Sequence, residues 1–439
     1  MNISDRAREL VWRAERELQK QFQRIDAVEA AVQLRVLEAF QRNRVAARHF
    51  APTTGYGYDD IGRDTLDRLF ADAMGAEAAL VRPQMVNGTH AIFLALAGVC
   101  RPGDHILSVT GRPYDTLEQA IGIRGDAPHS LKSLGVTFEQ VPLAPDGGFD
   151  MPAILRALAA QPAQVLFVQR SRGYNWRPSL HPRQMQQAFA ELAKAAPQAL
   201  IVVDNCYGEF TCATEPTQAG AHVVAGSLIK NPGGGLAPSG GYVAGRADLI
   251  DRIAQRLNVP GMGGEVGSYA GDYRPYYQGL FLAPHTTAQC IKSAVLFARV
   301  FELLELPTLP ASTEERSDII QSIRFPDADA LVRFCQSIQH AAPVDSFVDP
   351  EPWDMPGYAH QVVMAAGAFV QGATTELSAD GPICPPYTAY LQGALTYAHG
   401  RIAAMLAADA LFRTEAAGRH RRRMRPVTLP TTSTSDALR

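Results

Sequence analysis

Short apolar runs alternate with helical patterns from Gly55 to about Arg252, and no other feature of the sequence limits the fold as strongly. The runs with the length and composition of buried strands are 106–109, 136–141, 165–168, 200–203, 223–225 and 242–244. The helical patterns between several of them cover 88–99, 151–160 and 183–196. Strands and helices that alternate in this way form a mainly parallel sheet with helices on both faces. The sequence therefore predicts an α/β fold.

The two ends of the chain predict further parts. Residues 4 to about 46 carry apolar residues at three- and four-residue steps, so we expect a helix that Ser4 caps and that breaks near Asp26. This arm either packs as an ordinary helix or lies against the small domain or a partner subunit. The predicted organisation is an arm over 1–50, a large domain over 51–285, a smaller α+β C-terminal domain over 286–426 and a tail over 427–439.

The composition bounds the class of protein. A hydrophobic content of 46% and a charged content of 19% are typical of a soluble globular chain, and the net charge of −3 argues mildly against a protein that coats nucleic acid. No uncharged apolar run is long enough to span a bilayer and no apolar segment follows a basic start, so we expect a cytoplasmic protein. The six scattered cysteines form no CxxC pair, which favours buried free thiols over a metal site.

Lysine is scarce, and this narrows the search for an amine nucleophile. The five lysines are Lys20, Lys132, Lys194, Lys230 and Lys292. Only Lys230 has a predicted strand before it and a glycine-rich loop after it, in the segment GSLIKNPGGG over 226–235. The preceding strand, 200–203, ends on Asp204. In open α/β sheets, ligands bind beyond the carboxyl ends of the strands, where both residues fall.

An amine and a carboxylate in these places suit pyridoxal phosphate (PLP). The cofactor needs a lysine that holds its aldehyde as a Schiff base and an acid that keeps its pyridine nitrogen protonated. The offset from Asp204 to Lys230 leaves room for one strand, 223–225, so that both can reach a single ring. The sequence therefore predicts a PLP enzyme that acts on an amino acid.

Other residues would complete the cofactor site. Asn87, Gly88 and Thr89 open the helix 88–99, where free N–H groups favour a phosphate, although an ordinary helix cap is the alternative. Ser227 would add a hydroxyl to the same phosphate. Tyr114 follows the strand 106–109 and can stack on the ring and move protons; simple packing of this tyrosine is the alternative.

These segments resemble a known group of proteins. The chain is similar to the methionine gamma-lyase-like family, often labelled aluminium resistance proteins, in the cystathionine lyase branch of fold type I PLP enzymes. The matching segments are Gly55–Arg63, RPQMVNGTHA (82–91), QRSRGYNWRPSL (169–180), VDNCYGE (203–209), SLIKNPGGG (227–235), QGLFLAPH (278–285) and ELSADGPICPPY (376–387).

The resemblance implies Lys230 as the cofactor lysine, Asp204 as the pyridinium partner and Tyr114 as the stacking residue. It also implies that the phosphate binds to Gly88, Thr89 and Ser227. Tyr56 and Arg63 match a loop that reaches the phosphate of a neighbouring subunit, which implies a homodimer or homotetramer with shared active sites; a turn-rich connector is the alternative.

Two departures from the family concern the phosphate and the substrate. Asn87 stands where a small serine is expected, and Cys384 stands where a basic residue for the substrate carboxylate is expected. Arg172 and Arg274 are therefore candidate partners for that carboxylate, because arginine binds carboxylates with two parallel hydrogen bonds.

The implied function is a PLP-dependent carbon–sulfur lyase. Lys230 would remove the α-proton of a cysteine-, methionine- or cystathionine-like amino acid, and Tyr114 would protonate the leaving thiol. The products of this β- or γ-elimination are a 2-oxo acid, ammonia and a thiol. The alternatives are an aminotransferase, a γ-replacement enzyme, or a PLP-binding protein with a regulatory role and no turnover. A nicotinamide dehydrogenase is disfavoured because no GxGxxG turn joins a strand to a helix.

Overall fold

The large sheet confirms the predicted α/β fold. The computed structural model describes residues 3–355 and 358–423, with side chains up to Arg413, so the predicted tail over 427–439 lies outside it. Among these residues, seven strands form one sheet in the order β1 (Ala78–Arg82), β7 (Gly241–Gly245), β6 (Val223–Ser227), β5 (Leu200–Asp204), β4 (Val165–Gln169), β2 (His105–Ser108) and β3 (Thr137–Gln140). Only β7 runs antiparallel to its neighbours. All six predicted strands are present, and β1 is a seventh strand that was not predicted.

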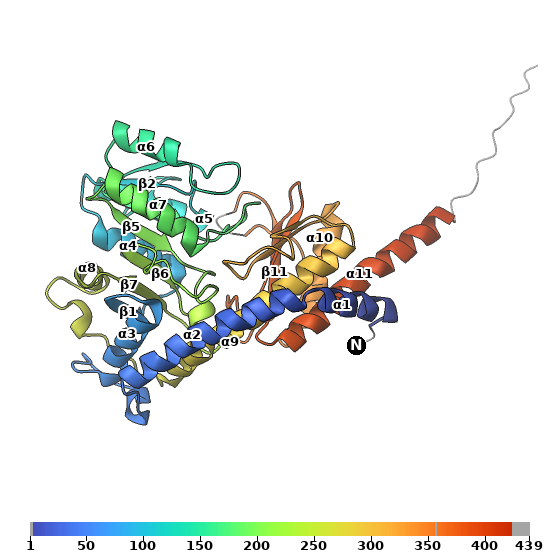
Figure 1. Cartoon of the computed structure of the whole chain (residues 1–439), viewed down its shortest axis with the longest axis horizontal. Coiled ribbons are helices and arrows are strands. Elements are labelled where there is room, and N and C mark those ends of the chain that lie inside the picture. Colours follow the sequence, from blue (N-terminus) through green and yellow to red (C-terminus); the bar gives the residue numbers. More distant parts are fainter. Residues whose placement is uncertain (1–2, 356–357, 424–439) are drawn as a thin grey trace, which may run out of the picture.

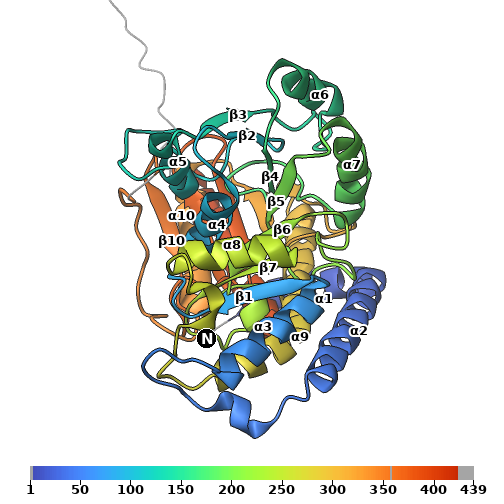
Figure 2. The same cartoon turned by 90° about the vertical axis from the view of Figure 1, so that its left-hand side faces the viewer.

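Helices cover both faces of this sheet, as Figure 2 shows. One face packs against α3 (Ile61–Met74), α6 (Met151–Ala160) and α7 (Pro182–Ala195). The other packs against α4 (Gly88–Val99), α5 (Asp115–Ile121) and α8 (Ala247–Leu257). Along β4, Val165 and Phe167 enter the second core while Leu166 and Val168 enter the first, as the two-residue period of a strand requires. Burial on both faces explains why these strands read as continuous apolar runs.

The smaller part of the molecule is built on an antiparallel sheet. Its strand order is β10 (Val362–Ala365), β11 (Ser378–Pro382), β12 (Thr388–Gln392), β9 (Gln321–Arg324) and β8 (Thr308–Leu309). The helix α10 (Ala328–Ala341) packs on it, and α11 (Tyr397–Arg423) packs against α10. The long helix α9 (Arg274–Leu303) belongs to both parts, since Leu280 lies in the core of the large sheet and Phe297 in that of the small one. The proposed domain boundary after residue 285 therefore falls inside a continuous helix.

The N-terminal arm consists of two helices, α1 (Asp5–Glu17) and α2 (Gln19–Arg42), and the Ser4 side chain caps the first. The prediction of a break near Asp26 was wrong, because the break lies at Leu18, which is buried in the core of the small domain. Asp26 instead forms an ion pair with Lys292 of α9 in the middle of α2. The helix α1 packs against α9 and α11, and α2 runs beside α9 (Figure 1).

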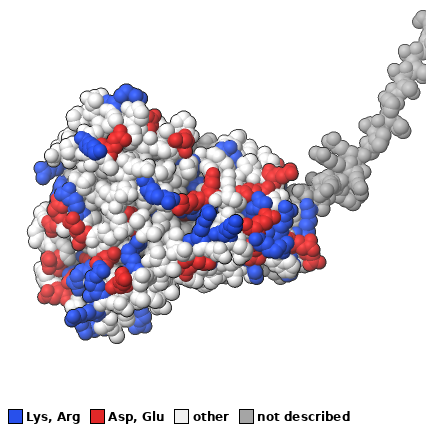
Figure 3. Space-filling model, viewed as in Figure 1, with Lys and Arg blue, Asp and Glu red and all other residues white. Residues whose placement is uncertain are grey.

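Short 3-10 helices join several elements: η1 (Ala47–Phe50), η2 (Lys132–Leu134), η3 (Asn231–Gly233) and η4 (Gly263–Glu265). On the face of the molecule in Figure 3, basic and acidic side chains are interspersed over both parts. In the part of the chain that the structure describes, no helix has the length and apolar character that crossing a membrane requires.

Candidate active site

The carboxyl ends of the parallel strands bring the predicted residues to one edge of the sheet. Gln169 at the end of β4 pairs in register with Asp204 at the end of β5, and Asp204 pairs with Ala225 of β6. Ser227 ends β6, and Lys230 follows three residues later. The order of the strands therefore places the carboxylate and the amine on neighbouring strands, in agreement with the spacing in the sequence.

Asp204 is a buried carboxylate with little compensation. Its Oδ1 accepts a hydrogen bond from the backbone N–H of Cys206 at 3.1 Å. Burial raises its pKa to about 6, and that N–H group and the positive charges of Lys230 and Arg177 only partly oppose the shift. Contact with a cation would lower the pKa of this carboxylate toward its ordinary value. The residue is therefore suited to hold a protonated ring nitrogen.

The amine of Lys230 points over an aromatic ring. Its Nζ lies 3.6 Å from the centroid of the Tyr207 ring, close enough for a cation–π contact. The following loop packs tightly under α9: at Gly234, with φ +56°, an added Cβ would lie 2.1 Å from the backbone oxygen of Gly279. The glycine run after Lys230 therefore lets the loop approach α9 and hold the lysine at the sheet edge.

Tyr207 occupies a strained position that sequence reasoning missed. Its φ of +71° lies in the left-handed region, which costs about 1–3 kcal/mol for a non-glycine residue. The side-chain amide of Asn231 holds this turn by donating to the backbone oxygens of Tyr207 and Glu209, at 3.0 and 2.9 Å. The turn thus directs an aromatic ring toward the catalytic lysine candidate, and a tyrosine after the predicted acid was the available signal.

The N-terminus of α4 and the end of β6 form a cradle for a phosphate. Asn87 caps the helix by accepting from the N–H of His90 at 2.9 Å, so its side chain serves the helix rather than an open site. The first intrahelical bond runs from Ala91 to Asn87, which leaves the N–H groups of Gly88 and Thr89 outside the helical pattern.

Ser227 provides the observation that tests whether a phosphate fits. Its Oγ is buried and has no hydrogen-bond partner among the described residues. At Gly88, an added Cβ would lie 3.0 Å from the Cβ of Ser227 and 3.3 Å from the Sγ of Cys206, so a side chain there would crowd the cradle. A buried hydroxyl without a partner, beside free N–H groups at a helix N-terminus, fits the phosphate of PLP.

Tyr114 lies beside these groups. Its hydroxyl donates to the Oγ1 of Thr89 at 2.7 Å, and its backbone N–H donates to the Oε1 of Gln169 at 2.9 Å. Burial and the negative charge of Asp204 raise the pKa of Tyr114 above its ordinary value. The structure thus brings Tyr114, Thr89 and Asp204 into one cluster, with the tyrosine neutral and able to donate a proton.

Three other predicted residues lie away from this cluster within the chain. Arg63 is buried and donates to the Asp64 carboxylate and to the backbone oxygens of Gly57 and Glu265. Tyr56 is 68% exposed and stacks on Tyr58, with ring centroids 5.6 Å apart. The exposed side chain of Arg274 pairs with Asp272 at 3.5 Å. The roles assigned to Tyr56, Arg63 and Arg274 remain predictions.

The other carboxylate candidate, Arg172, is fully buried and already has partners. Its guanidinium forms an ion pair with Asp318 at 3.3 Å and donates to the backbone oxygen of Leu309 at 2.8 Å. A further arginine, Arg324 at the end of β9, was missed by sequence reasoning; its guanidinium lies 3.9 Å from the Trp176 ring centroid. The Nε of Arg324 is buried and has no partner within the described residues.

Sequence reasoning also missed the side chains that the small domain contributes to the candidate site. They form its second wall. Asp380 of β11 lies close enough to Lys230 and to Tyr174, which follows β4, for both side chains to lower its pKa. The ring of Tyr174 lies 5.4 Å from that of Tyr358 and 5.0 Å from that of Tyr390, measured between centroids. Tyr174 belongs to a stretch that the sequence placed beyond a strand end, but no pattern in the sequence connects it with residues more than 180 positions away.

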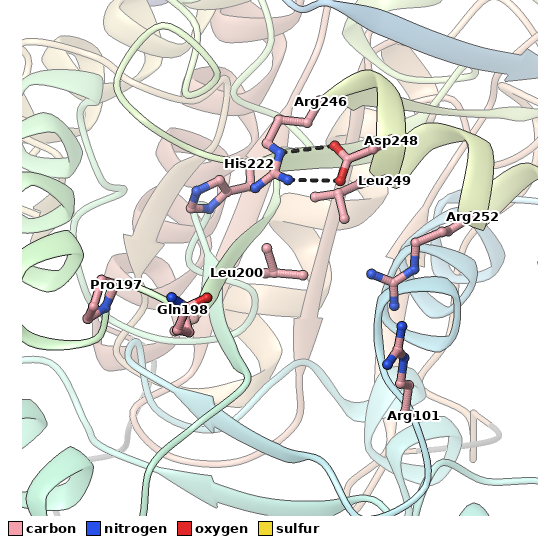
Figure 4. Close-up of a pocket in the computed structure, with 10 residues that line it drawn as sticks. Arg101, Pro197, Gln198, Leu200, His222, Arg246, Asp248, Leu249 and Arg252 are labelled. Atoms are coloured by element: carbon pink, nitrogen blue, oxygen red, sulfur yellow. Dashed lines mark hydrogen bonds and ion pairs between the residues drawn. The ribbon is translucent and has the colours of Figure 1, made fainter.

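A separate cavity of about 410 Å³ lies at the opposite end of β5, next to Leu200 (Figure 4). Its lining includes three arginines: Arg246 forms two hydrogen bonds to Asp248, Arg252 donates to the backbone oxygen of Val99, and Arg101 lies near them. In the described ranges, no group of three or more His, Cys, Asp or Glu side chains could hold a metal ion. The groups that suit PLP chemistry gather instead at the carboxyl edge.

Comparison with known proteins gives close relatives. A carbon-sulfur lyase involved in aluminum resistance from Clostridium novyi is 47% identical, with a TM-score of 0.90 over 93% of this chain and 96% of that one. A proposed cystathionine beta-lyase involved in aluminum resistance from Listeria monocytogenes is 45% identical, with a TM-score of 0.89 over 91% and 98% of the two chains. The Bacillus subtilis protein YnbB is 46% identical over 392 residues, which cover 89% of this chain and 93% of YnbB.

More distant structures share the fold alone. The pyridoxal-5'-phosphate-dependent protein YhfS from Escherichia coli is 18% identical, with a TM-score of 0.61 over 88% of this chain and 97% of that one. The methionine gamma-lyase family model matches residues 7–412. Both the family and the fold type predicted from the sequence are thereby confirmed. This chain belongs to the methionine gamma-lyase family, a group of PLP-dependent lyases of fold type I.

Proposed function

We propose that the protein is a PLP-dependent carbon–sulfur lyase that eliminates a thiol from the β- or γ-carbon of a cysteine-, methionine- or cystathionine-like amino acid. The observation that carries the proposal is the arrangement of Lys230, Asp204 and the unpartnered Ser227 hydroxyl at one sheet edge. The names of the Clostridium and Listeria relatives support the same reaction class.

The cofactor, when bound, withdraws electrons from the α-carbon of the substrate. Ser227 and the N–H groups of Gly88 and Thr89 hold its phosphate. The carboxylate of Asp204 would keep the ring nitrogen protonated, and the ring of Tyr114 would stack on the cofactor. These residues fix the position of the substrate relative to Lys230.

The proton transfers belong to Lys230 and Tyr114. The Lys230 amine would take the α-proton of the substrate as general base. The Tyr114 hydroxyl then gives a proton to the departing sulfur, because burial keeps this phenol neutral. Its hydrogen bond to Thr89 holds the hydroxyl in place before the transfer.

An arginine would hold the α-carboxylate of the substrate. Arg172 is occupied by Asp318, and Arg274 is exposed and paired with Asp272. Arg324 retains an Nε without a partner among the described residues and lies next to Trp176. We therefore add Arg324 to the two candidates as the one whose guanidinium is least committed.

The test is an absorbance spectrum of the purified holoenzyme, followed by borohydride reduction, peptide mapping and a panel of sulfur-containing amino acids. The expected result is a visible band, permanent attachment of the cofactor to Lys230, and release of 2-oxo acid, ammonia and thiol without an added keto acid. A protein that forms no band in excess PLP, or that turns over only with a keto acid or a second nucleophile, would contradict the lyase assignment.

Two further features of the proposal are the location and the assembly. All six cysteines are free thiols, which is typical of proteins in the reducing cytoplasm. The exposed rings of Tyr56 and Tyr58 stand on the loop that the family resemblance places at a subunit interface. A homodimer or homotetramer is therefore proposed, and sedimentation of the holoenzyme would measure it.

A further inference from the structure

Asp380 is a carboxylate that the proposed reaction does not use. It is half-buried in β11, the strand of the small sheet that contributes to the pocket. Asp380 pairs in register with Tyr390 of β12, so the two side chains lie on the same face of the small sheet. It is also close enough to the Tyr174 hydroxyl and to the Lys230 amine for both groups to lower its pKa. No arginine, lysine or histidine of the described residues lies within the 4.0 Å of an ion pair with Asp380.

Tyrosine rings surround the approach to this carboxylate. Tyr174 makes close ring contacts with Tyr358 and Tyr390, at centroid distances of 5.4 and 5.0 Å and interplanar angles of 41° and 30°. Tyr358 is also close enough to Asp380 to feel its charge. The face of a tyrosine ring is electron-rich and attracts cations, most strongly where water is excluded. An anion and several aromatic rings on one wall are the groups that recognise an organic cation.

The chemistry of the reaction limits what can supply that cation. The α-amino group of the substrate is used to bond the cofactor, and the α-carboxylate would be repelled by Asp380. The Lys230 amine lies over the ring of Tyr207, and the bond to the cofactor occupies it at rest. The remaining part of an amino acid substrate is the far end of its side chain, beyond the sulfur.

We propose that Asp380, with the rings of Tyr174, Tyr358 and Tyr390, selects substrates whose sulfur substituent ends in a cationic group such as an ammonium. This inference rests on the proposed lyase function and specifies its substrate class. Asp380 would pair with the cation, and the rings would cover its methylene groups. A neutral substituent of the same size would displace water from the carboxylate without supplying a cationic partner, which is costly in a partly buried site.

The test compares two amino acids of nearly equal shape, S-(2-aminoethyl)-L-cysteine and S-propyl-L-cysteine. The first ends in an ammonium and the second in a methyl group, while their reacting atoms are the same. We expect the wild-type holoenzyme to show a ratio of kcat/KM of about 10 to 100 in favour of the aminoethyl compound, the range for a hydrogen bond to a charged group. Asp380→Asn should bring this ratio to about one.

Control variants distinguish the loss of the Asp380 charge from a general loss of folding. Asp349→Asn removes an exposed carboxylate of the small domain, paired with His340 at 2.8 Å, and should leave the ratio unchanged. Tyr174→Phe keeps the ring and removes the hydroxyl group near Asp380, so it should retain a clear preference. The cofactor absorbance of each variant reports whether the site has folded.

Binding gives a second reading that does not depend on turnover. Titration of the cofactor spectrum with each amino acid yields a dissociation constant whether or not the amino acid is cleaved. If both compounds are cleaved or bound equally well by the wild type, the inference is wrong and the lyase function stands. If the aminoethyl compound binds preferentially but no thiol is released, the inference stands and the lyase function fails. Binding of neither compound would overturn both.

Discussion

The two walls of the candidate pocket are built in different ways. On the cofactor side, Asp204 and Ser227 end neighbouring strands and Gly88 begins a helix, so the register of the sheet fixes their relative positions. On the opposite side, Asp380 lies on a strand of the small sheet and Tyr174 in the loop after β4, and they meet only where the two parts of the molecule pack. Regular elements thus position the groups that would hold the cofactor. The contact between the two parts of the molecule positions the groups that we propose select a substrate.

Each wall contains a carboxylate whose pKa burial raises to about 6, but the surroundings differ. A backbone N–H group and the charges of Lys230 and Arg177 offset part of the burial of Asp204. Asp380 has the Tyr174 hydroxyl and the charge of Lys230. The first carboxylate is thus prepared for a cofactor that stays, and the second for a cation that arrives with each substrate.

The largest effect should come from the amine on the cofactor side. Lys230→Ala removes the group that takes the α-proton, so we expect kcat to fall by at least about 10³-fold. Stopped assays with quantified 2-oxo acid measure this loss. Lys292→Ala on α9 is the matched control and should retain turnover; lyase activity of the Lys230 variant near the wild-type rate would disprove the assignment of the cofactor wall.

Asp204→Asn should have the next largest effect. The amide keeps the shape but cannot stabilise a protonated ring nitrogen, so we expect a loss of about 10²-fold in kcat, corresponding to about 2.7 kcal/mol. Single-turnover absorbance with a saturating amino acid separates this chemical effect from binding. Unchanged kcat in this variant would show that the two carboxylates are not specialised as the comparison states.

The pH dependence of selectivity tests the other wall. Because the pKa of Asp380 is raised to about 6, the carboxylate is ionised above that pH and becomes neutral below it. The kcat/KM ratio of the aminoethyl to the propyl compound should therefore be constant near pH 8 and fall about tenfold between pH 7 and pH 5. The ratio cancels ionisations that affect both substrates, and Asp380→Asn should give a flat profile.

The tyrosines and the thiol that face Asp380 would not produce the same pH dependence of the ratio. The groups that face Asp380 are Lys230, Tyr174, Tyr207, Tyr358, Tyr390 and Cys335. Burial raises the pKa values of the tyrosines and of the thiol, so the tyrosines and the thiol stay neutral over the range tested. A ratio that rises as the pH falls would place the selective charge elsewhere.

The smallest effect concerns Ser227. Ser227→Ala removes a buried hydroxyl that has no partner among the described residues. The cofactor-free variant should be as stable as the wild type or up to about 1 kcal/mol more stable. Its affinity for the cofactor should be about tenfold weaker. Thermal unfolding and equilibrium titration with PLP measure the two quantities. Thr287→Val removes another buried hydroxyl without a partner among the described residues, and should change stability without changing cofactor affinity.

Much of the cofactor wall could be predicted, because the relevant signals are local. A strand followed by an acid, a strand followed by a lysine and a helix opened by small residues each occupy a few consecutive positions. The break in the arm was placed wrongly because the periodic pattern continues through Leu18, and only packing in the small-domain core shows where the helix axis changes. Tyr207 was missed because its left-handed backbone leaves no mark in a tyrosine side chain.

The sequence by itself determined the fold class, which rests on short apolar runs, and the family, which rests on the segments that resemble it. It also predicted residues to hold PLP from the polar residues that follow those runs. Only the tertiary structure decided that Asp380 joins Tyr174, and that Arg172 is already paired with Asp318. The physical reason is that these contacts depend on how two separately formed sheets pack together. That packing is the sum of many weak contacts between distant segments, and no period or motif in the chain records it.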